Sequence, residues 1–319
     1  MPIVKSTFKA HFRFRSGFIS TVYSGLIRRL KINQTRERIT LRDDDFIDLD
    51  WSYSPKPTKS VIILFHGLEG HGQRPYITGP ALHFNANNID AICVNFRCCS
   101  GELNRYYTSY HSGKTDDVED IIKYVVSLNK YDSIFLKGIS LGANILLKYL
   151  GDGSKVPTQV KAAMAVSVPC DLSGSAKALH TFKNLPYHIS FKWGLVKRLK
   201  LKQKQFPDAI SKAKIKTIKT LNDFDEVYSS RAHGFENAQD YYEKCSSLQF
   251  LEAIKTPVLI LNALNDSFLS NECYPFEAAE KNPNVFLETP ERGGHVGFIN
   301  CDGYYYNETR ALDFFLERE

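Results

Sequence analysis

Six short, almost uninterrupted apolar runs restrict the fold of this chain more than any other feature. They are SVIILF (60–65), IDAICVNF (89–96), SIFLKG (133–138), KAAMAVSV (161–168), PVLILNA (257–263) and NVFLET (284–289). Runs of this length and composition are typical of strands that are covered on both faces, as in a parallel sheet. The sequence therefore predicts an α/β protein built on a mostly parallel sheet.

Helical stretches lie between these runs, among them TDDVEDIIKYVVSLN (115–129) and GANILLKYLG (142–151). Strands that alternate with helices form right-handed crossovers, so we expect a doubly wound sheet with ligands beyond the carboxyl ends of its strands. Ahead of them, TRERITLRDDDFIDLDWSY (35–53) alternates apolar and polar residues around an Asp-rich turn. This pattern predicts a hairpin with one solvent-facing side.

The alternation of strand and helix breaks between about Leu172 and Ser247, where the sequence offers no convincing strand. We expect a helical, Lys-rich cap over 172–250, inserted after the sixth strand when the hairpin is counted. The core would comprise residues 35–171 and 251–319, preceded by an N-terminal helical segment over 1–34. A length of 319 residues suits one α/β core with such an insertion.

The net charge of +6 is concentrated in one segment. Ten basic residues and the single acid Asp208 lie between Lys192 and Lys219. Two explanations are a solvated helical face and an attraction to phospholipid head groups or another anionic substrate. No aromatic-basic recognition motif accompanies the charge, so we expect no nucleic-acid partner. Residues Phe18 to Leu30 could form a basic amphipathic helix, packed on the body or lying on a membrane surface.

The N-terminus lacks the apolar core of a secretory signal, and no run reaches the roughly 18 apolar residues of a membrane span. The seven cysteines are scattered and lie mostly in apolar runs, which indicates reduced packing residues. We therefore expect a cytoplasmic protein. Neither Cys98-Cys99 nor the loop with His66, Glu69 and His71 has the spacing of a metal site, so we expect no metal and no cofactor.

The stretch KGISLGAN (137–144) places Ser140 between Gly138 and Gly142, where a predicted strand meets a predicted helix. Glycines on both sides let the strand and helix approach closely, which lifts the hydroxyl into the open at a sharp turn. The start of a helix also offers N–H groups near a developing oxyanion. The pattern G-x-S-x-G predicts a nucleophilic serine.

A candidate base and a candidate orienting acid follow later in the chain, each just after a predicted strand. His295 lies in ERGGHVGF after the last predicted strand, and Asp266 comes directly after PVLILNA. The chain order Ser140, Asp266, His295 is the one used on α/β-hydrolase sheets. In this hypothesis His295 takes the Ser140 proton while Asp266 fixes the imidazole tautomer. Asp171, in VPCDL, is the alternative acid.

The loop FHGLEGHGQRPY (65–76) is expected to supply part of the oxyanion hole. The amide N–H of Leu68 would join that of Leu141 in an oxyanion hole. We interpret His66 as a structural hydrogen-bonding residue rather than a second base.

Several longer motifs resemble the YheT-like family of α/β-hydrolases, which includes bacterial predicted esterases, embryogenesis-associated proteins and related lipases and acyltransferases. They are HGLEGHGQRPYITG (66–79), NFRCCSGELNRYYTSYHSGKTDDVEDII (95–122), GISLGANILLKYLGD (138–152), DEVYSSRAHGFENAQDYYEKCSS (225–247), LNALNDSF (261–268) and GGHVGFI (293–299). The resemblance covers most of the chain and implies a Ser-Asp-His triad on Ser140, Asp266 and His295. Cys98 and Ala143 stand where the family usually has glycine, and the segment SYHSG (109–113) is a family feature without a derived role.

These observations favour a serine hydrolase that cleaves carboxylic esters with a short- to medium-chain or lipid-like acyl group through an acyl-enzyme. An alcohol O-acyltransferase with the same triad is the first alternative, and a non-catalytic binding protein with the hydrolase fold is the second. The expected partners are a small ester and, through the Lys-rich cap, an anionic membrane surface.

Overall fold

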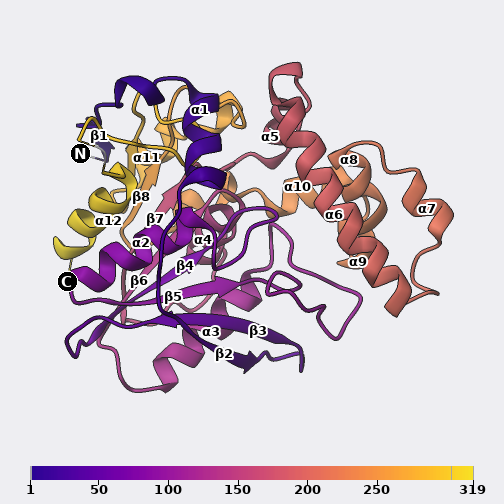
Figure 1. Ribbon diagram of the computed structural model, residues 1–319, viewed down its shortest axis with the longest axis horizontal. Coiled ribbons are helices and arrows are strands. Elements are labelled where there is room, and N and C mark those ends of the chain that lie inside the picture. Colours follow the sequence, from indigo (N-terminus) through magenta and orange to yellow (C-terminus); the bar gives the residue numbers. More distant parts are fainter. Residues whose placement is uncertain (1, 303, 319) are drawn as a thin grey trace.

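The computed structural model describes residues 2–302 and 304–318, and within them a nine-stranded sheet forms the centre of the protein (Figure 1). The strands are β1 (Ile3–Val4), β2 (Thr35–Thr40), β3 (Phe46–Ser52), β4 (Ser60–Phe65), β5 (Asp90–Asn95), β6 (Ser133–Ile139), β7 (Val160–Val166), β8 (Val258–Leu261) and β9 (Val285–Glu288). They lie in the order β1-β9-β8-β7-β6-β4-β5-β3-β2. Among these strands, β2·β3 and β3·β5 pair antiparallel and the other pairs are parallel, which confirms the predicted sheet.

Helices cover both faces of the sheet, as a doubly wound fold requires. The helices that belong to the sheet are α2 (Pro75–Ala86), α3 (Thr115–Ser127), α4 (Leu141–Gly151), α11 (Phe276–Lys281) and α12 (Tyr306–Leu316). Side chains of α3, α4 and α11 pack with one set of strand residues, and those of α2 and α12 pack with the alternate set. Each fully buried Leu, Ile, Val or Phe in these layers contributes roughly 1.5–3 kcal/mol.

The N-terminal segment differs in part from the helical prediction for residues 1–34. It begins with the two-residue strand β1, which pairs with β9 at the edge of the sheet. The turns that follow are helical, namely η1 (Phe12–Phe14), α1 (Gly17–Val22) and η2 (Tyr23–Ile27). Two residues are too few to give a periodic strand signal, so pattern analysis overlooked β1.

The hairpin β2–β3 forms as predicted, but the expectation of a solvent-facing side is wrong for β3. Every residue of β3 is buried, including Asp48 and Asp50. Arg38 Nε donates to Asp48 Oδ1 and Arg36 Nε donates to Asp50 Oδ1, both at 2.7 Å. The guanidinium groups of β2 therefore cover the carboxylates that the alternation assigned to solvent.

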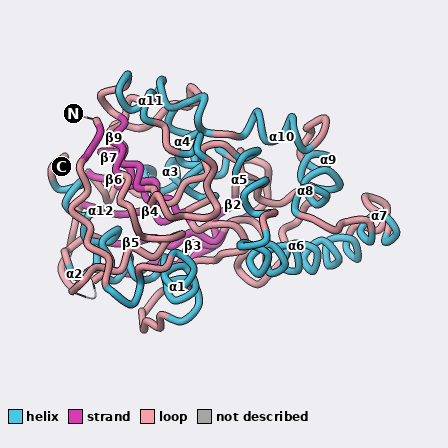
Figure 2. Tube along the Cα trace, turned by 90° about the horizontal axis from the view of Figure 1, so that it is seen from above, coloured by secondary structure: helices cyan, strands magenta, loops and turns pink. Residues whose placement is uncertain are grey.

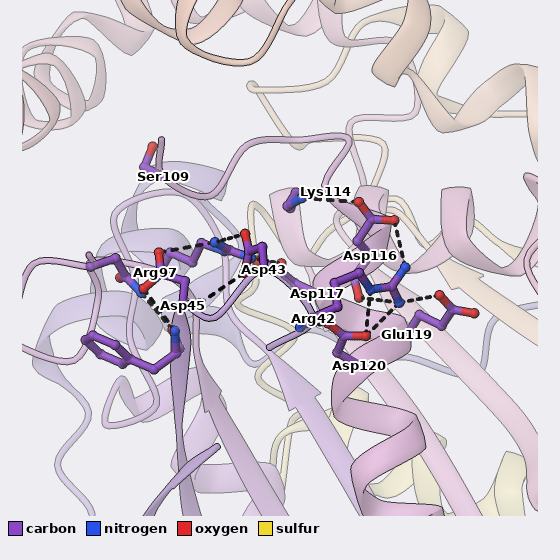
Figure 3. Close-up of polar contacts among 12 residues, drawn as sticks. Arg42, Asp43, Asp45, Arg97, Ser109, Lys114, Asp116, Asp117, Glu119 and Asp120 are labelled. Atoms are coloured by element: carbon purple, nitrogen blue, oxygen red, sulfur yellow. Dashed lines mark hydrogen bonds and ion pairs between the residues drawn. The ribbon is translucent and has the colours of Figure 1, made fainter. Parts of the chain in front are cut away.

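A buried arginine fastens the hairpin turn to the core (Figure 3). Arg97 follows β5 and donates to both carboxylate oxygens of Asp117 in α3, at 2.8 and 2.7 Å. Its Nη1 also donates to Asp43 at 2.7 Å and to Asp45 at 3.2 Å in the turn. Removing one partner of such a buried ion pair typically costs 3–5 kcal/mol, because the other charge is left without compensation.

A helical insertion occupies the chain between β7 and β8, and none of its described residues forms a strand. It contains α5 (Leu172–Leu179), η3 (Phe182–Asn184), α6 (Leu185–Gln205), α7 (Lys212–Lys216), α8 (Leu221–Phe224), η4 (Asp225–Ser229), α9 (Ser230–Ala232), α10 (Ala238–Cys245) and η5 (Ser247–Ala253), and η6 (Asn271–Cys273) follows β8. Figure 1 shows α6 to α9 standing to one side of the sheet. Because β1 adds a strand, the insertion follows β7 here, at the same point of the sequence as predicted.

None of the described helices is both long enough and apolar enough to cross a bilayer.

Candidate active site

Ser140 occupies the turn between β6 and α4 in a strained backbone conformation, with φ 54° and ψ −120°. A non-glycine residue at positive φ is uncommon and marks sites where the surrounding structure imposes the geometry. Neighbouring atoms lie so close to both flanking positions that only glycine fits there. A Cβ on Gly138 would lie 2.5 Å from Ala143 Cα, and one on Gly142 would lie 2.5 Å from the His66 carbonyl oxygen. The sharp strand-to-helix turn predicted around Ser140 is therefore present.

Asp266 and His295 lie together as the sequence predicts. The Nδ1 atom of His295 is 2.7 Å from Oδ2 of Asp266, whose side chain is fully buried. The other carboxylate oxygen of Asp266 accepts the amide N–H of Phe268 at 2.9 Å, and the Phe268 ring stacks on the imidazole. This arrangement favours a proton on Nδ1, which leaves Nε2 free to act as a base.

The alternative acid, Asp171, has a different function in the structure. It is the N-cap of α5, where Oδ2 accepts the amide N–H of Gly174 at 3.0 Å and the hydroxyl of Ser270 at 3.2 Å. The carboxylate that contacts His295 in the structure is that of Asp266.

The N-terminal segment supports the loop that carries His295, a role that the sequence analysis missed. The amide N–H of His295 donates to Thr21 Oγ1 at 2.8 Å, and Ser20 Oγ donates to the Gly293 carbonyl at 3.0 Å. Gly294 has φ 59°, and a Cβ there would collide with the carbonyl of Gly17. The glycine pair before His295 was the one feature of the sequence that hinted at this close packing.

Ser140 and His295 line one cavity of about 290 Å³ between the sheet edge and the insertion, and Leu68 and Leu141 also line it. A Cβ on Gly67 would lie 3.1 Å from Ser140 Cβ, so the chain just before Leu68 packs directly on the serine. Within residues 2–302 and 304–318, Ser140 Oγ makes no hydrogen bond to His295, and the amide N–H groups of Leu68 and Leu141 have no partner. Both amides are thus available to a ligand in the cavity.

His66 is a structural residue, as predicted. It is fully buried, its Nδ1 lies 2.8 Å from the Gly67 carbonyl, and its Nε2 accepts the amide N–H of Phe96 at 3.2 Å. Burial lowers the pKa of His66 to about 3. The neutral ring fixes the end of β4 and the start of the loop that carries Leu68.

The loop over residues 104–112, which contains most of SYHSG, is where the insertion attaches to the core. Lys202 of α6 donates to the carbonyls of Asn104, Tyr106 and Thr108. Further contacts join His233 to Ser109, and Tyr241 to Ser112. Asn144 of α4 donates to the Ser112 carbonyl at 2.9 Å, which connects this loop to the helix that follows Ser140. SYHSG therefore has a docking role that no short motif revealed.

Cys98 starts the turn that leads into this loop, and its backbone conformation is one that favours glycine. Its φ is 64°, in the left-handed region that favours glycine, and its amide N–H donates to Asn104 Oδ1. The cysteine is accommodated by this local bond.

An ion pair closes the cavity on the side of the Leu68 loop. Arg198 Nη1 lies 2.8 Å from Glu69 Oε1, and Glu69 itself has φ 55°. The amide N–H of Glu69 donates to the Tyr110 hydroxyl at 3.0 Å. Helix α6 approaches the carboxylate closely because residue 194 is a glycine.

Comparison with known proteins agrees with this architecture. Residues 60–300 match the model of the alpha/beta hydrolase fold family. The chain belongs to the α/β-hydrolase family, and its relatives, which carry esterase, phospholipase and lipase names, support a hydrolase enzyme of the esterase and lipase type.

Its relatives identify the branch. The chain is 32% identical to the YheT protein of Escherichia coli K12, which carries an esterase name, over 90% of this chain and 85% of that protein. It is 29% identical to the phospholipase ABHD3 of Mus musculus over 88% of this chain and 70% of that protein. The solved esterase PF2001 of Pyrococcus furiosus shares the fold, with a TM-score of 0.61 at 16% identity, over 90% of this chain and 92% of that one. The predicted YheT-like resemblance is confirmed.

Proposed function

We propose that the protein hydrolyses carboxylic esters with Ser140 as nucleophile, His295 as base and Asp266 as orienting acid. The observation that carries the proposal is the His295–Asp266 pair, whose imidazole lines the same cavity as the strained serine turn. Catalytic serine and histidine side chains are often not yet hydrogen-bonded in a ligand-free enzyme, so their separation here is compatible with the mechanism.

The reaction follows from the atoms in the cavity. His295 Nε2 accepts the Ser140 proton as Oγ attacks the ester carbonyl, and the new oxyanion accepts the amide N–H groups of Leu68 and Leu141. The imidazolium, stabilised by Asp266, then gives its proton to the departing alkoxide and an acyl-enzyme remains. A water molecule repeats the sequence and releases the acid, which restores Ser140. Each oxyanion donor is worth roughly 10²- to 10³-fold in rate.

The cavity supports an apolar acyl group. Its lining includes Leu172, Leu179, Phe191, Leu195, Leu221 and Phe224 from the insertion. A volume of about 290 Å³ suits a short- to medium-chain acyl group, and the relative named phospholipase supports a lipid-like ester. We include a cytoplasmic location and a contact between the Lys-rich insertion and an anionic membrane in this proposal.

Labelling with a fluorophosphonate probe tests the nucleophile. We expect the probe to modify Ser140 in the wild type, with the adduct located by peptide mass spectrometry, and to leave Ser140→Ala unlabelled. A non-catalytic binding protein would show no labelling in either protein, and this result would contradict the proposal.

Product analysis in the presence of ethanol separates hydrolysis from acyl transfer. Hydrolysis predicts free acid as the main product from an activated ester, whereas an alcohol O-acyltransferase would yield mainly the ethyl ester.

A further inference from the structure

Exposed large apolar side chains concentrate in two segments that lie far apart in the sequence. The N-terminal turns and the insertion contribute Phe18, Ile19, Leu26, Ile27, Phe182, Leu185, Ile189, Trp193 and Leu201, and we call this set the mouth patch. Trp193 is 66% exposed, Leu26 68% and Phe182 90%. Large apolar side chains gathered at one exposed place generally mark an interaction surface.

The part of the mouth patch on α6 is a regular stripe. Leu185, Ile189, Trp193 and Leu201 are spaced by four or eight residues, so they follow one ridge that winds around the helix, with Leu201 turned roughly 160° about the axis from Leu185. Lys197 fills the remaining position of this ridge, and its Nζ lies 4.9 Å from the centre of the Trp193 ring. An aromatic ring with a lysine over it is a combination suited to the boundary between water and lipid.

The two parts of the patch meet beside the cavity. Tyr187 of α6 packs against Phe18 of α1, with ring centres 5.5 Å apart, and its hydroxyl donates to the Phe18 carbonyl. Both segments also line the cavity, through Val22 and Leu26 on one side and Phe191 on the other. Figure 2 shows α1 and α6 along the same side of the molecule, with α10 on the opposite side. The mouth patch therefore borders the entrance to the candidate active site.

The charge around the patch selects its partner. Residues 1–36 contain no Asp or Glu, and neither does α6 over its 21 residues, although the chain has 35 acidic residues. The same two segments carry exposed basic side chains instead, namely Arg13, Arg15, Arg29, Lys183, Lys197, Lys200 and Lys204. A second copy of the same surface would bring like charges together. An anionic lipid surface complements both the basic and the apolar side chains.

We propose that the mouth patch docks on an anionic lipid bilayer, with Trp193, Ile189 and Ile27 entering the boundary between head groups and acyl chains. Docking in this orientation turns the cavity entrance toward the membrane, so that a lipid ester reaches Ser140 without crossing water. Each basic residue near an anionic surface contributes on the order of 1 kcal/mol, and this part falls with added salt. The docking itself does not depend on catalysis, but delivery of the ester rests on the proposed function.

Vesicle sedimentation with the full-length protein tests the docking. We expect binding to phosphatidylcholine vesicles that contain phosphatidylglycerol, and binding roughly 10-fold weaker to phosphatidylcholine alone. Ile189→Glu and Trp193→Glu, neither of which lines the cavity, should each weaken binding to the anionic vesicles by about 10-fold or more. The matched control is Leu316→Glu, because Leu316 is 52% exposed and Ile189 is 51% exposed. Figure 1 shows its helix, α12, at the opposite end of the molecule from α6.

Two further measurements separate a loss of docking from a loss of folding or of catalysis. Turnover of a short, water-soluble ester should be unchanged in the Ile189→Glu and Trp193→Glu proteins, which shows that they are folded and active. Ser140→Ala should bind vesicles like the wild type, so a failure of the catalytic proposal leaves the docking result intact. Equal vesicle binding by patch and control variants, no binding by the wild type, or a wild-type dimer that Trp193→Glu dissociates would each overturn the proposal.

Discussion

The sheet edge and the helical insertion meet at the candidate active site, yet they are built very differently. At the sheet edge, the strands before Ser140 and Asp266 are buried throughout. The amide N–H of Phe268 donates to Asp266, and the amide N–H of His295 donates to the Thr21 hydroxyl. The insertion has a small apolar cluster of its own, against which Leu68 and Tyr107 of the core also pack, and it joins the core through polar contacts such as those of Arg198 and Lys202. In the proposed function the sheet edge supplies the chemistry, whereas the insertion lines the pocket.

The contacts of the insertion are not distributed at random. Several of them reach two loops of the core, through Arg198 at Glu69 and through Lys202 and Tyr228 at residues 104–108. The first of these loops carries Leu68, whose amide is a proposed oxyanion donor. The position of the insertion is thereby coupled to the geometry of the site.

The largest expected effect comes from removing the orienting acid at the rigid edge. Asp266→Asn should lower kcat by roughly 10⁴-fold with little change in KM, because the amide favours the wrong imidazole tautomer. Steady-state kinetics on a p-nitrophenyl ester measures this. Asp171→Asn, which alters only the N-cap of α5, is the control and should keep nearly full turnover. Similar losses in both variants would remove the distinction between the two acids.

A second prediction compares the stability of the two regions. Arg97→Met leaves Asp117 buried without its charge partner and should lower the free energy of unfolding by about 3–5 kcal/mol. Arg198→Met breaks a more accessible pair and should cost roughly 1 kcal/mol or less. Urea unfolding of both variants measures the difference. An equal loss would show that the insertion is as integral to the core as the hairpin turn.

The ion pair between insertion and core should matter for turnover more than for stability. We expect Arg198→Met and Glu69→Gln each to lower kcat by about 10-fold, since a displaced Leu68 amide loses part of the effect of one oxyanion donor. The double variant should be no worse than either single variant, because one interaction is lost in all three. Additive losses in kcat, or a change confined to KM, would contradict the coupling.

The last prediction concerns how stability depends on pH through one carboxylate of the insertion, Asp225. Burial raises the pKa of Asp225 to about 6, although Ser229 and Tyr242 donate hydrogen bonds to its carboxylate. The folded state therefore binds more protons than the unfolded state between about pH 4 and pH 6, and stability falls as pH rises through that window. Asp225→Asn should be about 2–3 kcal/mol more stable than the wild type near pH 7.5 and within about 0.5 kcal/mol of it near pH 4.

Chemical denaturation at both pH values checks this, with the exposed Asp208→Asn as the control. A gain that persists at low pH would assign the effect to something other than the carboxylate.

Much of the sheet edge could be predicted because its signals are local. The run SVIILF corresponds residue for residue to β4, and Asp266 and His295 were found from their positions just after predicted strands. The support of His295 by Thr21 joins residues 274 positions apart, and no pattern within one segment encodes such a contact. The same holds for SYHSG, whose hydrogen-bond partners include His233, just after α9, and Tyr241 of α10. The prediction that Asp48 and Asp50 face solvent was wrong, because each is buried in an ion pair with an arginine of β2.

The most direct test of the account is turnover by wild type and Ser140→Ala, measured side by side on p-nitrophenyl esters from two to twelve acyl carbons. We predict that the substitution lowers kcat by roughly 10⁴-fold or more, and that the wild type prefers a short to medium chain in keeping with the cavity. Equal turnover by the two proteins would contradict the central claim that Ser140 is the nucleophile.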